Sequence, residues 1–174
     1  MDRRQACGRE FVFERERYSG FADGDGRPRL MLYCDTSALL KLYVEEADSD
    51  LLKLAVSKAD SVVVCRIAWA EAFAALSRRA REVPEDRPVI ETAKAALTAD
   101  WGHYVVLEVS QSVVERAGDY ADTFALRGYD SVQLAAAFEA GQITRTVIDF
   151  ACFDVRLNKA AKVLGMNVLE PSQT

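Results

Sequence analysis

The chain has 174 residues, of which half are apolar, and a formal net charge of −5. A chain of this length can bury roughly two thirds of the surface that its unfolded form exposes, so we expect one compact domain rather than two. The acidic balance argues against a protein that coats nucleic acid by bulk attraction, but it does not exclude a nuclease with a local acidic metal pocket.

No apolar run approaches the roughly 18 residues that a membrane-spanning helix needs, and the N-terminal residues lack the apolar core of a secretory signal. We therefore expect a cytoplasmic protein. The four cysteines (Cys7, Cys34, Cys65 and Cys152) form no CxxC pair and His103 is the only histidine, so we do not predict a zinc site. We interpret the last three cysteines as small buried residues in strands and His103 as structural.

Residues 1–30 differ in character from the rest of the chain. They are rich in Arg and Glu and show no sustained helical or strand period. We expect an N-terminal extension, either without fixed structure or translated from a misassigned start, with the domain spanning residues 31–174. Met31 directly precedes the first strand and is the alternative start. Asp23 and Asp25 faintly resemble a calcium loop, but the third acidic position and the closing Glu are missing, so we predict no metal there.

From Leu32 onward, short apolar runs that predict strands alternate with helical patterns. The expected strands are residues 32–34, 61–65, 104–109, 146–153 and 167–170. The expected helices lie within residues 37–59, 67–81, 112–126, 130–140 and 155–165. Strands separated by helices imply right-handed crossovers, and hence an α/β fold with a parallel sheet covered on both faces. Such open sheets bind ligands outside the carboxyl ends of their strands, where the strand order reverses.

Two carboxylates in the first half of the chain occupy informative positions. Asp35 directly follows the first strand, which places it at the ligand-binding edge; the alternative is that Asp35, Thr36 or Ser37 simply caps the next helix. Glu71 is the only charge in the stretch IAWAEAFAAL, which predicts a largely buried helix. A carboxylate in such a helix is costly unless it is paired, hydrogen-bonded or bound to a metal, although a solvent-facing Glu71 is the alternative.

Two further carboxylates lie at predicted helix starts in the second half. Asp130 begins a helix, where Gln133 three residues later also resembles a capping box. Asp154 lies between the fourth strand and the last helix and is again a possible cap. Asp149 lies inside that strand and is an alternative to Asp154, pointing to the opposite face if the run stays extended. Together these acids predict an oxygen-rich site of the kind that Mg²⁺ or Mn²⁺ prefers.

The segments YCDTSALLKLYV, RIAWAEAFAAL, LRGYDSVQLAAA and CFDVRLNKAAKVLGMNVLEP resemble PIN domains, specifically the VapC-like toxins of type II toxin–antitoxin systems. This resemblance spans nearly all of residues 32–171. It implies a three-layer α/β/α fold with a five-stranded parallel sheet. It also implies that Asp35, Glu71, Asp130 and Asp154 form an acidic metal site, with Thr36 or Ser37 as a supporting oxygen. The fourth position varies in the family, and Asp149 is the substitute.

The resemblance further implies a metal-dependent endoribonuclease that hydrolyses RNA phosphodiester bonds with one or two Mg²⁺ or Mn²⁺ ions. It implies a VapB-like antitoxin as partner and a homodimer, with RNA as substrate and no membrane. Four cations lie close in sequence to the proposed site and are candidate phosphate contacts, or else solvated surface charges: Arg66, Arg127, Arg156 and Lys159.

Two other functions compete with this prediction. The domain could be a PIN-fold binding module without nuclease activity, although the presence of all four carboxylates weighs against this. A phosphatase with Asp35 as the aspartyl nucleophile is less well supported, because Ser37 stands where the second aspartate of such enzymes is usual and no downstream lysine motif is evident.

Overall fold

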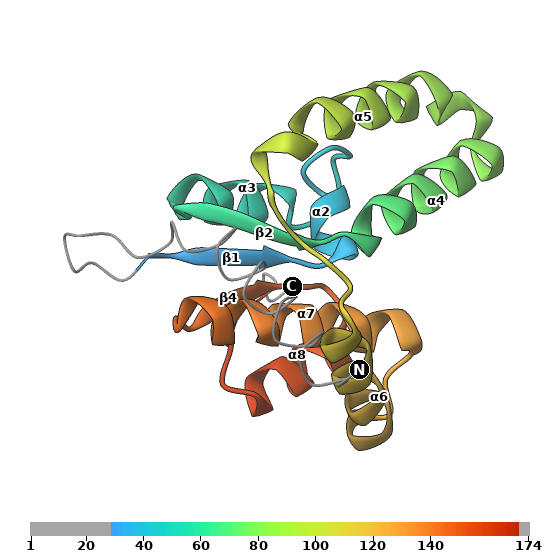
Figure 1. The fold of residues 1–174 in the computed structure, drawn as a ribbon. Helices are drawn as coiled ribbons and strands as arrows, with labels where there is room; N and C mark the ends of the chain where they lie inside the picture. The colour runs from blue at the N-terminus through green and yellow to red at the C-terminus, as the bar shows by residue number, and fades with distance from the viewer. Residues whose placement is uncertain (1–28, 171–174) are drawn as a thin grey trace, which may run out of the picture.

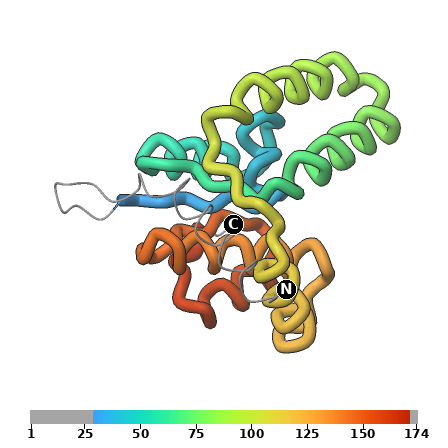
Figure 2. The backbone as a smooth tube through the Cα atoms, viewed as in Figure 1, coloured from blue at the N-terminus to red at the C-terminus, as the bar shows by residue number. Residues whose placement is uncertain are grey.

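The computed structural model describes residues 29–170, and the tube in Figure 2 follows the chain through them. The predictions for Asp23, Asp25 and Cys7, and nearly all of the expected N-terminal extension, lie outside the described residues. Within residues 29–170, no helix is long and apolar enough to cross a membrane.

A five-stranded parallel sheet forms the centre of the molecule, as the sequence predicts. The strands are β1 (Met31–Cys34), β2 (Ser61–Cys65), β3 (Val105–Leu107), β4 (Ile148–Ala151) and β5 (Asn167–Val168), and their spatial order is β3-β2-β1-β4-β5. In the register of the sheet, Tyr33 lies between Val63 and Phe150. The short apolar runs become strands because both of their faces are covered by helices.

Helices cover both faces, so the expected three-layer α/β/α architecture is confirmed (Figure 1). One side carries α2 (Thr36–Leu40), α3 (Ser49–Lys58), α4 (Ile67–Glu82) and α5 (Arg87–Asp100); the other carries α6 (Gln111–Phe124), α7 (Gly128–Thr144) and α8 (Val155–Val163). Successive side chains along a strand point to opposite faces of the sheet and belong to two different apolar cores. Leu32 and Val64 belong to the core on the α2–α4 side, and Tyr33 and Phe150 to the core on the α7 side.

Helices α4 and α5 run out from the sheet and back as a hairpin (Figures 1 and 2), joined by a 3₁₀ turn, η2 (Pro84–Asp86). The hairpin has its own small apolar cluster, in which Leu76 and Ala80 of α4 meet Ile90 and Ala93 of α5. We did not predict α5. Its buried residues Ile90, Ala93 and Leu97 recur at helical spacing, so the signal was present in the sequence.

Three local expectations were wrong. The helical pattern of residues 37–59 is divided between α2 and α3, and the strand expected to reach residue 153 ends at Ala151. Helix α4 is not buried nearly all round, since its fully buried positions form one stripe (Ala68, Ala72, Leu76 and Ala80), whereas Ala70 and Ala74 are exposed. Alanine counts as apolar in a pattern, but its small side chain is exposed at little cost and favours the helix wherever it lies.

Candidate active site

The strand order reverses between β1 and β4, and the carboxyl ends of these two strands lie side by side. Cys34 is level with Ala151, and the Asp35 amide donates a hydrogen bond to the Ala151 carbonyl at 3.0 Å. In open α/β sheets such a switch point is where ligands bind. The fold therefore places Asp35 at the edge that the sequence predicted for chemistry.

Asp35 is both a helix cap and a buried carboxylate. Its Oδ1 accepts hydrogen bonds from the Ala38 amide and the Ser37 hydroxyl, each at 2.8 Å, and the residue is only 7% exposed. Burial, with a smaller contribution from the charge of Glu71, raises the pKa of Asp35 to about 6, although the hydrogen bonds to its carboxylate oppose the rise. The capping interpretation is thus correct, but it does not account for the cost of burying this charge.

A partly buried hydrogen-bond network holds Glu71. Its Oε2 accepts hydrogen bonds from the Thr36 hydroxyl at 2.5 Å and from the Gln133 side-chain amide at 2.6 Å. The same amide donates to the Thr36 hydroxyl at 2.9 Å, and the Tyr33 hydroxyl donates to Gln133 Oε1 at 2.7 Å. Burial raises the pKa of Tyr33 well above its ordinary value, so its hydroxyl remains a donor. The Gln133 carbonyl must face Tyr33, and its NH₂ group therefore faces Glu71.

Asp130 and Asp154 form a second pair. Asp130 is partly buried in the first turn of α7, and its pKa is raised by burial and by the charge of Asp154. Asp154 is exposed and caps α8, accepting hydrogen bonds from the amides of Arg156 at 2.8 Å and Leu157 at 3.0 Å. The charges of Arg127 and Arg156 oppose the rise in the pKa of Asp130, so both guanidinium groups lie near the pair.

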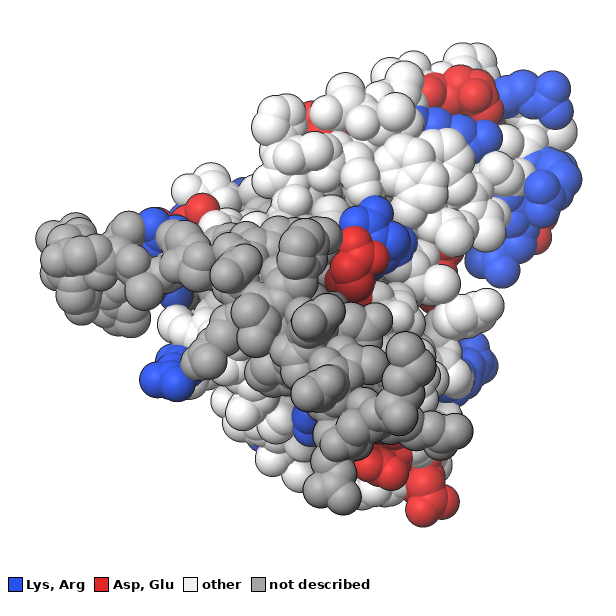
Figure 3. Space-filling model, in the orientation of Figure 1, with Lys and Arg blue, Asp and Glu red and all other residues white. Residues whose placement is uncertain are grey.

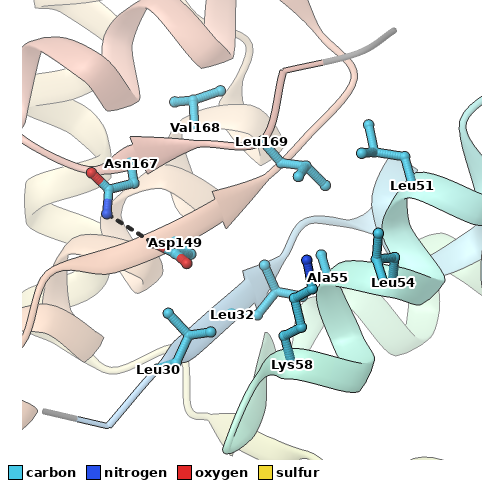
Figure 4. A pocket seen from close by; sticks show the side chains of 10 residues that line it. All are labelled: Leu30, Leu32, Leu51, Leu54, Ala55, Lys58, Asp149, Asn167, Val168 and Leu169. Atoms are coloured by element: carbon cyan, nitrogen blue, oxygen red, sulfur yellow. Dashed lines mark hydrogen bonds between the residues drawn. The ribbon is translucent and has the colours of Figure 1, made fainter.

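Asp149, the alternative fourth acid, points elsewhere. It is level with Leu32 in the sheet, three residues before Asp35, and accepts a hydrogen bond from the Asn167 side chain at 2.9 Å. Figure 4 shows it in a separate hollow of about 380 Å³, which Leu30 and Lys58 also line. Asp154, whose charge acts on Asp130, is the better candidate.

The candidate RNA-contacting cations differ in their surroundings. Arg66 lies just before α4, and its guanidinium donates two hydrogen bonds to Glu108 in an ion pair. Arg127 and Arg156 are exposed and lie near Asp130, and Lys159 is exposed on α8. On the face drawn in Figure 3, other cations gather at the far end of the α4–α5 hairpin, where Arg78, Arg81 and Arg87 are exposed.

The cysteines and the histidine behave largely as expected. Cys34 and Cys65 are buried in strands, and His103 is exposed in a 3₁₀ turn, η3 (Trp101–His103). Cys152 is buried just after β4 rather than inside it, because that strand ends early. Its thiol accepts a hydrogen bond from the Asp154 amide at 3.2 Å and also interacts with Asp35. The thiol therefore lies between Asp35 and the backbone of Asp154.

Comparison with known proteins identifies this arrangement. A family model described as PIN domain matches residues 32–163. The chain is also 32% identical to the VapC49 ribonuclease of Mycobacterium tuberculosis over 142 residues, which cover 79% of this chain and 94% of that protein. The chain belongs to the PIN domain family. The resemblance found in the sequence is thereby confirmed.

Solved structures agree with this PIN fold. Mycobacterium tuberculosis VapC20, described as a sarcin-ricin loop cleaving toxin, superposes with a TM-score of 0.56 at 19% identity, covering 74% of this chain and 94% of that one. VapBC2 from Rickettsia felis was solved bound to a DNA fragment from its promoter. It gives a TM-score of 0.55 at 11% identity, covering 80% of this chain and 97% of that one. At these identities the likeness concerns the fold.

The side chains of this PIN domain fit a hard divalent cation by their chemistry. The candidates are carboxylate oxygens and the Thr36 hydroxyl, which are the ligands that Mg²⁺ and Mn²⁺ prefer. The buried charge of Asp35 would also be offset by a cation. Within residues 29–170, however, no three Asp, Glu, Cys or His side chains stand close enough to surround an ion as they lie.

Gln133 is the site residue that sequence reasoning missed. We weighed it only as a capping partner of Asp130, yet it is 3% exposed and hydrogen-bonded to residues 62 and 100 positions away. A weak signal existed, because Gln133 is the one polar side chain in the run VQLAAAF. A polar residue so placed needs hydrogen-bonding partners.

Proposed function

We propose that this PIN domain is a VapC-type endoribonuclease, the toxin of a toxin–antitoxin pair, and that it cleaves RNA with a divalent metal ion. The observation that carries the proposal is that β1 and β4 end side by side, so that Asp35 and Asp154 follow neighbouring strands at the same edge of the sheet. The charge of Glu71 acts on Asp35, and the charge of Asp154 acts on Asp130. Support comes from the 32% identity to a VapC ribonuclease over almost that protein's whole length. The aspartyl phosphatase alternative has no comparable support.

We assign the metal site to Asp35, Glu71, Asp130 and Asp154, with Mg²⁺ or Mn²⁺ as the cation. When bound, such a cation lowers the pKa of a water molecule and polarises the phosphate oxygens. Thr36 and Gln133 orient Glu71 by directing two hydrogen bonds to its Oε2, which leaves Oε1 available for a ligand. Ser37 and the Ala38 amide orient Asp35 in the same way through its Oδ1.

Hydrolysis at this site needs neither histidine nor the 2′-hydroxyl of the substrate. The water oxygen forms a bond to phosphorus and releases one proton to the solvent, while the bond from phosphorus to the 3′-oxygen breaks. The departing oxygen takes up one proton from the solvent, so that one water molecule is consumed. The products are a 5′-phosphate and a 3′-hydroxyl. Arg127 and Arg156 flank Asp130 and Asp154, so they are suited to hold the phosphates next to the scissile bond.

A VapB-like antitoxin and a second copy of the chain are the further partners that we propose. VapBC2 of Rickettsia felis, which shares the fold, was solved together with promoter DNA, and this supports searching for an antitoxin partner of this chain. Co-expression with VapB-like antitoxins, followed by size measurement of the free and co-purified chain, tests both proposals.

Cleavage of a mixed RNA pool tests the enzymatic proposal. Wild type, Asp35→Asn and Asp130→Asn are compared with Mg²⁺, with Mn²⁺ and with chelator, after circular dichroism has established that all three are folded. We expect cleavage by the wild type alone, abolished by chelator, with 5′-phosphate ends on the products. Equal cleavage by all three proteins would point to a contaminant and favour a PIN-fold binding module instead.

A further inference from the structure

A second hollow opens at the same edge of the sheet as the acids. Its volume is about 440 Å³, and its lining residues are Arg66, Ile67, Trp69, Ala70, Trp101 and Val109. They come from the start of α4, from η3 and from the segment after β3. Figure 1 shows the yellow segment that follows α5 passing beside the start of α4, which brings these distant residues together.

Two tryptophans form the aromatic wall of this hollow. The rings of Trp69 and Trp101 lie 4.9 Å apart, centre to centre, at an angle of 73°. Each is held from behind by another ring, because Phe73 stacks on Trp69 at 4.7 Å and Tyr104 meets Trp101 edge to face at 6.2 Å. Both indoles are half-buried, so their positions are fixed by packing while part of each remains accessible.

We propose that this hollow binds one unpaired nucleobase of the RNA substrate. The inference rests on the proposed function, since it assigns a substrate subsite to the same enzyme. Proteins recognise single-stranded RNA by stacking splayed-out bases on aromatic side chains and on arginine planes, and both kinds of group line this hollow. Ile67, which lines the hollow, lies four residues before Glu71 and therefore on the same side of α4, so a nucleotide bound here would place its neighbouring phosphate toward the acids.

The rim of the hollow carries a guanidinium beside the aromatic wall. Arg66 is the charged residue among the six that line it, and its side chain is 51% exposed at the rim. The ion pair with Glu108 holds the guanidinium in place there, where it can also meet a phosphate. Arg127 and Arg156 lie near Asp130, so together with Arg66 they would put cations on both sides of the scissile bond.

The chain offers an intrinsic probe of this hollow. Trp69 and Trp101 are its only tryptophans, so tryptophan fluorescence reports on the two indoles that line it. The full chain carrying Asp35→Asn, which we expect to bind RNA without cleaving it, is titrated with a single-stranded RNA octamer of mixed sequence and with the same octamer as a duplex. We expect saturable quenching by the single strand and little by the duplex, whose bases are already stacked.

Two matched variants locate the binding. In the Asp35→Asn background, Val109→Glu places a carboxylate in the hollow, whereas Val163→Glu adds the same charge at the exposed end of α8. Losing one stacked base weakens binding by about 10-fold or more. We therefore expect Val109→Glu to raise the Kd for the single strand by about that factor, and Val163→Glu to leave it unchanged.

The outcomes separate this inference from the proposed function. If the octamer binds without quenching, or if both glutamate variants bind equally well while the wild type cleaves RNA, the chain is a nuclease but the hollow is not its base subsite. If the octamer does not bind and the wild type does not cleave, both proposals fail. Quenching by the single strand that Val109→Glu weakens selectively establishes the subsite.

Discussion

Replacing Asp35 with asparagine should stabilise the fold at neutral pH while abolishing cleavage. The asparagine side chain has nearly the same shape and retains an Oδ1 that can accept the hydrogen bonds of Ser37 and the Ala38 amide. The substitution removes a charge that is almost fully buried and that faces the charge of Glu71. It therefore separates the energetic cost of this carboxylate from its chemistry.

The magnitude follows from the pKa of Asp35, which burial raises from an ordinary 3.8 to about 6. A rise of this size corresponds to about 3 kcal/mol of lost stability once the carboxyl is ionised. Because the folded chain holds this proton more tightly than the unfolded chain, the contribution of Asp35 is most favourable below pH 4. It is lost as the pH rises from about 4 to above 6.

The assay is urea unfolding followed by circular dichroism at several pH values between 4 and 8, with chelator present so that no cation neutralises Asp35. The free energy of unfolding of Asp35→Asn should match that of the wild type near pH 4 and exceed it by about 3 kcal/mol at pH 8. Adding Mn²⁺ at 100 times its Kd should then stabilise the wild type by about 2.7 kcal/mol and Asp35→Asn much less. A variant that is less stable than the wild type at pH 8, or a difference that does not change with pH, would refute this reasoning.

Three further substitutions test other parts of the site. Gln133→Leu leaves the buried Tyr33 hydroxyl without its acceptor, so the free energy of unfolding in urea should fall by about 1–3 kcal/mol, and the cleavage rate should also fall. If neither quantity changes, Gln133 does not belong to the site. Asp149→Asn should leave the cleavage rate within about twofold of that of the wild type, because Asp149 lies in another hollow. A large loss of cleavage would instead identify Asp149 as the fourth acid of the site. Arg156→Ala should weaken RNA binding by a similar factor for all sequences. In titrations at several salt concentrations, it should also reduce the slope of log K against log salt concentration by about one. An unchanged slope argues against a phosphate contact.

The sequence by itself determined the fold class and the positions of the four acids along the chain. Strand and helix alternation is a local property, because burial imposes its period on neighbouring residues. Asp35 could be placed at the carboxyl edge of the sheet because it directly follows an apolar strand, which is also recognised from neighbouring residues. Patterns of apolar residues were less informative where alanine is frequent, and for this reason the burial of α4 was overestimated.

The tertiary structure decided which of these residues meet. The sheet order places β1 beside β4, and only then do Asp35 and Cys152 become neighbours, while Asp149 is left in a different hollow. The Gln133 network and the Trp69–Trp101 contact likewise join residues that are 32 to 100 positions apart. Such contacts depend on how separate helices pack against one sheet, and no periodicity within a single segment encodes them.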